Sequence, residues 1–565
     1  MIILNYKLEF DNWMKLAGDP DLKEKMLRDN NLPQKTLEIK IEENFGRDLK
    51  FGTAGLRGVM DYGSNKINVH TVIKATEALA ESVISHDGKD KGVVIAYDTR
   101  TNSKLFAETS AKTLAKKGIK VYLFNSIAPT PILSFAVRHF NAQAGIMITA
   151  SHNPPEYNGY KVYWDKGSQI TSEIAEEISE KLSSQIIDFY QHAKILSENC
   201  SSYPDYITMI GEELEDLFVN KVFLMKENFT TENSNLSVVY SPLHGTGLDP
   251  MIKLMKKLNY NVNVVESQAF PDPNFSTLSS PNPEEIEAYS LAVSLASALN
   301  SDVVITTDPD ADRIGVMVLH HGKYELIDGN ALGAIIADYV LKSLHKKNLL
   351  RENDAVLSTI ATDKMIESIA ETYGISSIKV HVGFKNIYDK ANLWDSTKEF
   401  NYILGYEESF GVGVGSELFR DKDAISAAMI ITNLAAKLKE ENKTLIDYYQ
   451  ELNERYGYFK NKMMSKVFEG SNGKEKMDNI MNEIRSNPIH SIGGKTITKK
   501  TDFLHDKTPL PKENVLLLEY DEDWIMLRPS GTEPKLKIYL YSKNTDKSTA
   551  EKSLILLEEA VSKVI

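Results

Sequence analysis

The sequence predicts an α/β protein of several domains with mostly parallel sheets covered by helices, followed by a smaller α+β domain at the C-terminal end. Apolar runs typical of buried strands alternate with segments of helical period from residue 93 onward, which favours parallel sheets. In three successive rounds of this alternation, a core strand ends in a loop rich in polar side chains. The residues from 451 onward lack the alternation and contain proline-bearing segments instead.

The first part of the chain predicts an N-terminal extension and one α/β domain. Residues 1–47 form polar, amphipathic patterns, and we expect them to be helices packed on the first domain, which spans 48–205. Ser103 is a plausible N-cap for the first clear helix of this domain. The expected elements are a strand at 93–97, a helix at 103–117, and strands at 121–124 and 144–149.

The alternation returns twice before the C-terminal domain begins. We expect a second domain over 206–325, a third over 326–450, and a fourth, α+β domain over 451–565. The expected strands of the second and third domains are 238–240, 262–266, 302–306, 355–358, 378–381 and 402–405, with a helix at 283–299. The fourth domain has expected strands at 514–518, 524–527 and 536–540 and a final helix at 547–564.

Composition and charge exclude several classes of protein. The 565 residues carry a formal net charge of −14, which argues against a general nucleic-acid binder but allows a small basic pocket for an anionic metabolite. Cys200 is the single cysteine, so no intrachain disulfide forms, and a reducing compartment is the simplest inference. We expect a cytoplasmic protein with no membrane partner, because no signal peptide pattern and no apolar run of roughly 18 residues is present.

The segment from Thr149 to Trp164 contains the first candidate reactive group. A buried apolar run stops at Ser151 and His152, and the two prolines that follow can neither continue a strand nor begin a helix in register. Ser151 is therefore expected on a stiff loop at the end of a core strand. With His152 beside it and Lys161 nearby, its hydroxyl is arranged for nucleophilic or phosphoryl-transfer chemistry. Taken alone, the segment favours an ordinary strand-ending turn in which the serine satisfies backbone groups.

The second loop predicts a metal site. Asp308, Asp310 and Asp312 alternate along a loop after the buried strand at 302–306, so their oxygens can converge on Mg²⁺ or Ca²⁺. An EF-hand is not expected, because Arg313 stands where that loop needs glycine. A phosphatase with Asp308 as nucleophile is disfavoured by Asp312, and the remaining alternative is a solvated acidic turn.

Two further loops offer groups that bind sugars and phosphates. Glu407 and Ser409, on a glycine-flanked loop, can accept hydrogen bonds from sugar hydroxyls, although an acidic surface turn has the same composition. Arg528 to Thr532 combines a guanidinium with hydroxyls and backbone amides, as a phosphate nest does, and the alternative there is a plain turn. The glycine-flexed loops at 51–58 and 382–385 each add one cation, Arg57 and Lys385.

Taken together and in this order, the four loops resemble those of the α-D-phosphohexomutase superfamily, which comprises phosphoglucomutases, phosphomannomutases and their relatives. The resemblance rests on the motifs TASHNP, DPDADR, EES and RPSGTEPK and covers almost the whole chain. The extension at 1–47 and the motif FGTAGLRG are similar to the subgroup that contains Bacillus-type phosphoglucomutases and animal phosphopentomutase-like enzymes. The resemblance implies four domains around a central cleft, the first three sharing one α/β topology.

The resemblance also implies a role for each candidate residue. Ser151 would carry a phosphate, and the three aspartates would hold Mg²⁺ with an oxygen of that phosphoserine as a further ligand. Glu407 and Ser409 would bind the sugar. The implied positions around the non-reacting phosphate of the substrate are Arg528, Ser530, Gly531 and Thr532. Those around the reacting phosphoryl group are Arg57, His152, Lys161, Arg313 and Lys385, and Gly383 and Lys385 are implied to bind the substrate.

The implied activity is the interconversion of hexose 1-phosphate and hexose 6-phosphate through a phosphoserine enzyme and a glucose 1,6-bisphosphate intermediate. We expect glucose to be preferred and mannose tolerated, because the two sugars differ only at C2, which changes sides when the intermediate turns around. A pentose lacks the C6 arm and would shorten the distance between the phosphates. The alternatives are a phosphopentomutase, a sugar 1,6-bisphosphate synthase, and a non-catalytic scaffold that binds sugar phosphates.

Overall fold

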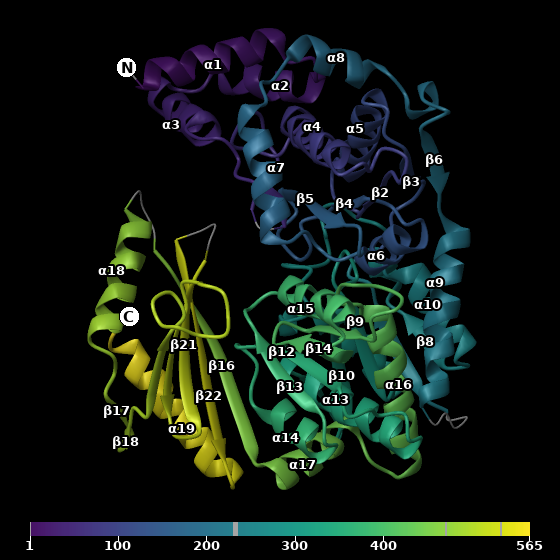
Figure 1. The fold of residues 1–565 in the computed structure, drawn as a ribbon, viewed down its shortest axis with the longest axis vertical. Coiled ribbons are helices and arrows are strands. Elements are labelled where there is room, and N and C mark those ends of the chain that lie inside the picture. Colours follow the sequence, from purple (N-terminus) through teal and green to yellow (C-terminus); the bar gives the residue numbers. More distant parts are fainter. Residues whose placement is uncertain (1, 53, 230–234, 469–471, 531–533) are drawn as a thin grey trace.

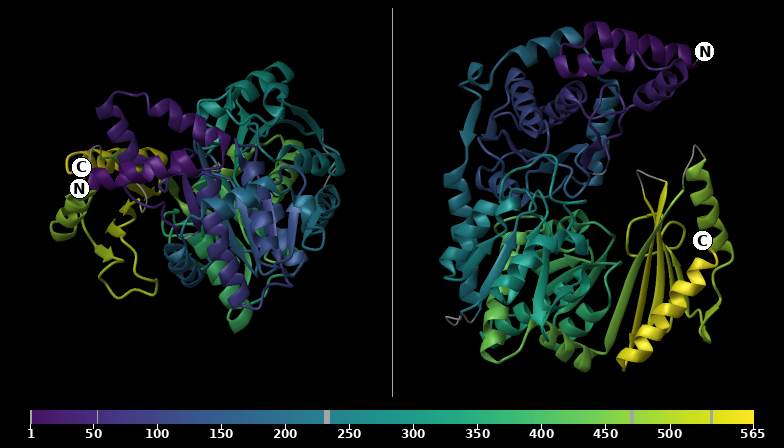
Figure 2. Two further views of the ribbon diagram at one scale, coloured as in Figure 1. Left: turned by 90° about the horizontal axis from the view of Figure 1, so that it is seen from above. Right: turned by 180° about the vertical axis from the view of Figure 1, so that it is seen from behind.

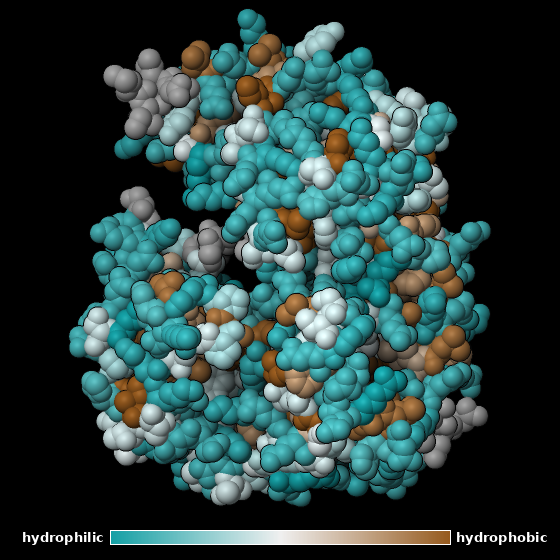
Figure 3. Space-filling view, viewed as in Figure 1, coloured by the Kyte–Doolittle hydropathy of each residue, from teal (hydrophilic) through white to brown (hydrophobic). Residues whose placement is uncertain are grey.

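The computed structural model describes residues 2–52, 54–229, 235–468, 472–530 and 534–565. These residues form a first unit (2–210), a second unit (212–327), a third unit (329–456) and a C-terminal unit (458–565), each with its own sheet. The first unit lies at the top of Figure 1, the second and third lie together below it, and the C-terminal unit stands apart at the lower left. Figure 2 shows the same separation from behind, and Figure 3 shows the surface hollowed between the first and C-terminal units.

The first unit contains a mixed sheet of order β1-β5-β4-β2-β3-β6, in which β4, β2, β3 and β6 are parallel, and β5 pairs antiparallel with both β4 and β1. Its strands are β1 (Gly55–Val59), β2 (Val93–Tyr97), β3 (Val121–Phe124), β4 (Ala144–Ile148), β5 (Tyr157–Trp164) and β6 (Ile207–Ile210). Its helices are α1 (Ile2–Leu16), α2 (Pro20–Asp29), α3 (Gln34–Phe45), α4 (Val69–Ser85), α5 (Ser103–Lys116), α6 (Thr130–His139), α7 (Ser172–Ser184), α8 (Phe189–Ser197) and the 3₁₀-helix η1 (Cys200–Ser202). Every residue of β2 and β4 is buried, which confirms the strands predicted from their apolar runs.

The second unit has the order β11-β10-β9-β7-β8, in which β9, β7 and β8 are parallel, and β10 pairs antiparallel with both β9 and β11. Its strands are β7 (Ser237–Ser241), β8 (Asn261–Val264), β9 (Val303–Thr307), β10 (Ile314–His320) and β11 (Lys323–Ile327). Its helices are α9 (Glu212–Leu224), η2 (Met225–Asn228), α10 (Leu248–Lys257), α11 (Glu266–Ala269), η3 (Ile286–Tyr289) and α12 (Ser290–Leu299).

The third unit has the order β13-β12-β14-β15, in which only β15 is antiparallel to its neighbour within the described chain. Its strands are β12 (Asp354–Thr359), β13 (Ser376–Val380), β14 (Asn401–Glu407) and β15 (Gly411–Val414). Its helices are α13 (Gly329–Lys346), α14 (Met365–Thr372), α15 (Phe384–Thr397), α16 (Ala424–Glu440) and α17 (Leu445–Tyr456). The first three units therefore share one plan, in which antiparallel strands are added to one side of a parallel core.

The C-terminal unit has an antiparallel sheet of order β16-β22-β21-β20-β19 and a small β17–β18 hairpin. Its strands are β16 (Tyr458–Val467), β17 (Ser491–Ile492), β18 (Lys495–Thr496), β19 (Lys499–Asp502), β20 (Leu516–Tyr520), β21 (Asp523–Pro529) and β22 (Lys535–Asn544). Its helices are α18 (Gly473–Ser486) and α19 (Lys547–Ser562). This arrangement confirms the predicted change to an α+β C-terminal unit, while the domain limits at 47, 205, 325 and 450 stay predictions.

Two local predictions were wrong. Ser103 is the first residue of α5 and not its N-cap, because its hydroxyl donates to Asp98 at 2.7 Å, while Asn102 precedes the helix in a left-handed conformation. The helix expected at 283–299 begins late, as η3 and then α12, because residues 283–284 form a turn in which the amide of Glu284 donates to Oδ1 of Asn282 at 3.1 Å.

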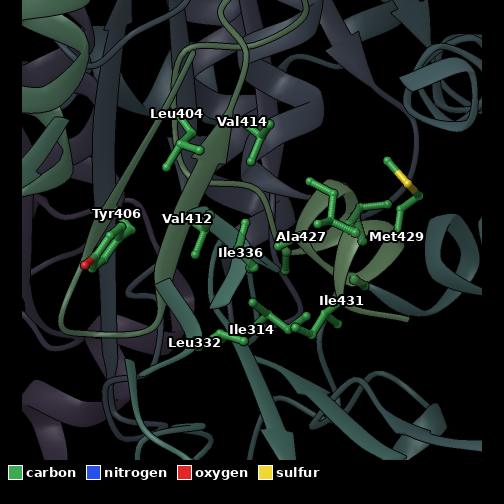
Figure 4. Packing of buried hydrophobic residues seen from close by; sticks show 14 of the residues in the cluster. Ile314, Leu332, Ile336, Leu404, Tyr406, Val412, Val414, Ala427, Met429 and Ile431 are labelled. Atoms are coloured by element: carbon green, nitrogen blue, oxygen red, sulfur yellow. The ribbon is translucent and has the colours of Figure 1, made fainter. Parts of the chain in front are cut away.

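The hydrophobic core joins the second and third units. Figure 4 shows side chains of α13, α16, β14 and β15 packed against Ile314 of the second unit, and the same cluster extends to α6 of the first unit. The C-terminal sheet has a separate core and reaches the third unit through a smaller cluster that includes Ala361 and Trp524. Within the described chain, no helix has both the length and the apolar character that crossing a membrane requires.

Candidate active site

The three polar loops of the first three units are hairpin connections. Each follows a parallel core strand and precedes an antiparallel one: β4 to β5, β9 to β10, and β14 to β15. The loops contact one another, since the amide of Ile314 donates to the carbonyl of Phe410 at 3.2 Å and the hydroxyl of Ser151 donates to Asp308 at 2.7 Å. Polar side chains from three sheet edges are thereby brought to one place.

A cavity of about 600 Å³ opens where these loops meet, and all four units contribute to its walls. The predicted site residues that line it are Arg57, Ser151, His152, Lys161, Asp312, Arg313, Gly383, Lys385, Glu407 and Arg528. Asp308 lies beside the cavity, where it accepts a hydrogen bond from Ser151, and Asp310 accepts one from Lys161. Ser409 lies elsewhere, in the wall of a neighbouring cavity of about 180 Å³.

Ser151 is held rigidly at the end of β4. Its backbone is left-handed, with φ at 53°, and its amide donates to the hydroxyl of Thr149 at 2.8 Å. Its own hydroxyl donates to Oδ2 of Asp308 at 2.7 Å and lies 3.3 Å from Nδ1 of His152. Only 4% of the residue is exposed, so the hydroxyl is fixed against the acidic loop before any ligand arrives.

The side chains of Asp308, Asp310 and Asp312 offer oxygens within 4.8 Å of one another, and all three residues are buried. Oδ1 of Asp310 and both carboxylate oxygens of Asp312 make no hydrogen bond to any residue that the structure describes. Burial, with Asp312 and Asp310 nearby, raises the pKa of Asp308 well above its usual range. Buried carboxylate oxygens that accept no hydrogen bond, in a cluster of like charge, fit a hard divalent cation.

Lysines from two units surround this acidic cluster. Nζ of Lys161 lies 2.7 Å from Asp310 and 3.5 Å from Asp312, and Nζ of Lys422 lies 3.2 Å from Asp312. Burial opposes the charged form of Lys161, but Asp310 and Asp312 outweigh it and raise the pKa of the lysine. Lys422 shows the same balance, with Asp312 and Glu407 raising its pKa. Both ammonium groups therefore stay charged near neutral pH.

Arginines complete the wall on the side of the first and second units. Arg57, on β1, donates to Oδ1 of Asn153 at 3.1 Å and so contacts the loop that contains Ser151. Gly55, at the start of the same strand, must be glycine because a Cβ at this position would lie 1.9 Å from the carbonyl oxygen of Tyr160 on β5. Arg313 forms an ion pair with Glu284 of the second unit. Burial, with Arg313 and Arg57 nearby, lowers the pKa of His152 well below its usual range, so this imidazole is neutral.

The third unit contributes a carboxylate and a lysine at the opposite wall. Glu407 ends β14, and its Oε1 lies 3.7 Å from Nζ of Lys422. Gly383 has φ at 112°, a backbone conformation that favours glycine, and precedes α15. Lys385 lies in the first turn of that helix, and burial lowers its pKa.

The C-terminal unit places Arg528 in the cavity wall. Nε of Arg528 donates to Oε1 of Glu513 at 3.1 Å, and the other oxygen of Glu513 lies 3.2 Å from Nδ1 of His381 in the third unit. The amide of Ser530 donates to the carbonyl of Lys535 at 2.7 Å, which closes the turn after β21. Gly531 and Thr532, the rest of the predicted phosphate nest, lie outside the described residues.

The sequence interpretation missed several residues at the site. Lys422 is the most important, because it bridges the acidic loop and Glu407. The sequence does contain an indication of Lys422, because a run of charged residues, 420–423, directly precedes the apolar helix α16. Burying charges there costs free energy unless they are paired. Thr130 donates to Oδ2 of Asp310 at 2.8 Å from the start of α6, and nothing in the local sequence indicated this contact.

Comparison with protein families gives three matches along the chain. Residues 48–186 match the model for phosphoglucomutase/phosphomannomutase alpha/beta/alpha domain I, residues 216–322 match domain II, and residues 328–456 match domain III. These matches include the Ser151, Asp308 and Glu407 loops in the order in which the structure brings them together.

Curated relatives and solved structures agree with the family matches. The chain is 37% identical to a phosphoglucomutase of Staphylococcus epidermidis over 515 residues, covering 88% of this chain and 91% of the relative. It is 35% identical to a phosphoglucomutase of Staphylococcus haemolyticus over 555 residues, covering 95% and 96%.

Among solved structures, the open form of parafusin, a phosphoglucomutase from Paramecium, superposes with a TM-score of 0.68 at 18% identity and covers 91% of this chain and 95% of its own. A phosphoglucomutase/phosphomannomutase family protein from Burkholderia thailandensis gives 0.67 at 15% identity and covers 91% and 97%. These two likenesses concern the fold. The family models and the curated relatives together show that the chain belongs to the phosphoglucomutase/phosphomannomutase family.

Proposed function

We propose that the protein is a phosphoglucomutase, an isomerase that interconverts glucose 1-phosphate and glucose 6-phosphate by moving a phosphoryl group through Ser151. The observation that carries the proposal is the hydrogen bond from Ser151 to Asp308, in a cavity whose walls also present cations from all four units. Curated phosphoglucomutases at 35–37% identity over nearly the whole chain support the same reaction.

The working form of the enzyme carries phosphate on Ser151. The Oγ atom of Ser151 is the acceptor and donor of the phosphoryl group, and its left-handed backbone and its bond to Thr149 keep it in one position through the cycle. Holding a reacting atom in place removes the entropy of searching for it, which is a large part of what phosphoryl transfer needs from a protein.

Mg²⁺ is the cation that we propose for Asp308, Asp310 and Asp312, and when bound it would neutralise negative charge on the transferring phosphoryl group. A neighbour of the same fold, N-acetylphosphoglucosamine mutase of Aspergillus fumigatus, was solved with GlcNAc-6P and magnesium; it gives a TM-score of 0.51 at 14% identity over 97% of this chain and 99% of its own. Lys161 and Arg313 add fixed positive charge from either side of the acidic loop.

The far end of the substrate is bound by the third and C-terminal units. Arg528 supplies the cation for the phosphate that does not react, and Ser530, Gly531 and Thr532 belong to the same proposed phosphate site. Gly383 and Lys385 of the third unit are further substrate-binding candidates in the cavity wall. Glu407 accepts hydrogen bonds from the sugar hydroxyls between the two ends, and we keep Ser409 as a further candidate for this contact. A bisphosphate intermediate, glucose 1,6-bisphosphate, fits a site with cations at both ends because it must bind in either orientation.

Glucose phosphates are the preferred substrates in this proposal, and mannose phosphates are tolerated. The difference at C2 changes sides when the intermediate turns around, and losing one weak contact discriminates by only ~1–3 kcal/mol. A pentose lacks the C6 arm, which shifts its attacking hydroxyl relative to Ser151, and a misplacement of ~1 Å can lower the rate by about 100-fold.

The test is a comparison of kcat/KM for glucose-, mannose-, ribose- and deoxyribose-1-phosphate with Mg²⁺, following the corresponding 6- or 5-phosphate product. We expect the order glucose, then mannose, then both pentoses, with Ser151→Ala as the inactive control. A higher value for either pentose would make the protein a phosphopentomutase, and release of free bisphosphate as the main product would make it a bisphosphate synthase. Binding of these phosphates without turnover would indicate a scaffold.

A further inference from the structure

The loop that bears Ser151 has an unusual conformation for which its own sequence provides no reason. Ser151 has φ at 53°, a region that residues other than glycine rarely occupy, and it is not asparagine or aspartate, whose side chains favour this region. The turn must therefore be held by contacts from outside the loop.

Those contacts come mainly from one side chain, Arg100, in the segment between β2 and α5. Nη2 of Arg100 donates to the carbonyl of Ser151 at 2.6 Å and also to the carbonyl of Asn153. Nη1 donates to the carbonyls of Pro154 and Tyr157 at 2.7 and 3.1 Å. One guanidinium thus donates hydrogen bonds to main-chain carbonyl oxygens along the whole loop, from Ser151 to the start of β5.

Arg100 is itself fixed from behind. Oδ2 of Asp98 lies 3.3 Å from its Nε, and Oδ1 of Asp98 accepts the amide of Arg100 at 2.9 Å. The side chains of both residues are fully buried. Thr149, which accepts the amide of Ser151, also hydrogen-bonds to Asp98, so the carboxylate orients both the arginine and the residue at the end of β4.

The second unit covers the remaining face of the guanidinium. The ring of Phe275 lies 4.9 Å from the guanidinium carbon of Arg100, and 1% of Phe275 is exposed. The loop that carries Phe275 continues to Glu284, which pairs with Arg313 at the cavity. The second unit therefore packs Phe275 against Arg100, in addition to contacting Ser151 through Asp308.

We propose that Arg100, covered by Phe275, is a positioning residue that holds Ser151 in its left-handed conformation and so aims its hydroxyl at Asp308 and at the incoming phosphoryl group. This inference rests on the proposed function, because it assigns Arg100 a part in the phosphoryl transfer through Ser151. Arg100 does not line the cavity that holds the substrate, so its effect falls on the rate of transfer and not on substrate binding.

The test uses the full-length protein with Arg100→Lys, which keeps the charge but offers a single nitrogen in place of the planar fork. We expect kcat with glucose 1-phosphate to fall by about 100-fold, as for a ~1 Å misplacement, while KM changes less than about threefold. The rate at which Ser151 takes up phosphate from glucose 1,6-bisphosphate, followed by intact mass, should fall in parallel.

Arg138→Lys is the matched control, because Arg138 also donates to main-chain carbonyls, those of Lys166 and Glu417, but touches no residue of the Ser151 loop. It should leave kcat within about threefold of the wild type. Phe275→Leu, which removes only the ring from the guanidinium, should lower kcat by several-fold with KM unchanged. It supplies the test if Arg100→Lys does not fold.

Wild-type kcat in folded Arg100→Lys, or wild-type kcat in Phe275→Leu if the lysine variant is unfolded, would overturn the proposal. A rise in KM with kcat unchanged would also overturn it, because the residue would then serve substrate binding. If Ser151→Ala keeps full activity, the proposed function fails and the role of Arg100 fails with it. If Ser151→Ala is inactive and Arg100→Lys is normal, only the positioning role fails.

Discussion

The Ser151 region and the Arg528 region of the same cavity are built differently. Around Ser151, the reactive groups are buried and bonded across two units: Ser151 to Asp308 at 2.7 Å and Lys161 to Asp310 at 2.7 Å. Arg528 keeps 28% of its side chain exposed and pairs with Glu513, which is 30% exposed. The C-terminal unit that carries it stands apart from the first unit, with the hollow of the surface between them (Figure 3).

The difference separates two tasks. Buried charges that are paired act strongly on a reaction, and removing one of them leaves its buried partner without a counter-charge. A solvent-accessible ion pair contributes little to stability by itself. The part that performs phosphoryl transfer is therefore assembled before substrate binds. The part that anchors the distal phosphate is left accessible to solvent, as expected for a group that must release and rebind a substrate that turns around.

Loss of Ser151 should have the largest effect. Ser151→Ala removes the oxygen that accepts the phosphoryl group, so turnover should disappear while the fold is kept. Intact mass should show an added phosphate on the wild type and none on the variant. Ser110→Ala, which removes a buried hydroxyl bonded to the carbonyl of Phe106, is the control and should stay active. Near-normal turnover of pure Ser151→Ala would contradict the assignment of phosphoryl transfer to the Ser151 region.

Removal of the cation site should come next. Asp310→Asn deletes a proposed ligand and also weakens the partner of buried Lys161, so we expect activity to fall by at least about 1,000-fold. A chelator should abolish activity in the wild type and Mg²⁺ should restore it. Mg²⁺ should also raise the Tm of the wild type but not of the variant. Asp302→Asn, at an ion pair with Lys439 away from the site, is the control. Full activity in chelator would mean that the acidic loop holds no catalytic metal.

Loss of the exposed anchor should have a smaller effect. A hydrogen bond to a charged group contributes on the order of 1.5–3 kcal/mol, so Arg528→Ala should lower kcat/KM by about 10- to 100-fold. A fall in kcat/KM that comes mainly from a higher KM, with phosphate still present on Ser151, would support the division of tasks between the Ser151 and Arg528 regions. Lys543→Ala, at an ion pair with Glu522 on the same sheet, should have no effect on kinetics. Unchanged kinetics in folded Arg528→Ala would show that the distal phosphate binds elsewhere.

The smallest effect concerns stability at the junction with the C-terminal unit. Glu408 lines the smaller cavity with Tyr541, and burial, with Glu407 nearby, raises its pKa to about 7. The folded state then binds this proton more tightly than the unfolded state, whose carboxyl has a pKa of about 4.3. Stability should therefore fall as the pH rises from about 4.3 to about 7 and change no further, through this group, at higher pH.

Glu408→Gln should remove that loss, so its Tm should exceed the wild-type Tm at pH 8 and match it at pH 4.5. Glu558→Gln, at an ion pair on the surface of the C-terminal unit, should show no such rise with pH. An equal Tm difference at both pH values would show that Glu408 is not the group responsible.

Much of the architecture followed from local patterns. Strands β2 and β4 are continuous apolar runs, and β9 and β12 each contain a three-residue apolar run at 303–305 and 355–357. All four strands are fully buried, and such runs predict buried strands without knowledge of their partners. The antiparallel strands β5, β10 and β15 were not predicted. β5 mixes apolar residues with polar ones such as Lys161, which lines the cavity, so its pattern is not that of a buried strand. β10 and β15 consist mostly of glycine and apolar residues, and their antiparallel pairing is a property of the assembled sheets.

The sequence by itself determined which residue types are available for chemistry: a serine at a strand end, three alternating aspartates, and arginines and lysines on glycine-bearing loops. Tertiary structure decided which of them meet. Lys422 reaches Asp312, Thr130 reaches Asp310, and Arg100 holds the Ser151 loop, because hairpins from separate sheets turn toward one point. Ser409 was placed outside the main cavity for the same reason. The amino-acid sequence fixes which side chains each loop contains. The distances between loops of different sheets depend on packing across hundreds of residues, and no local sequence pattern predicts them.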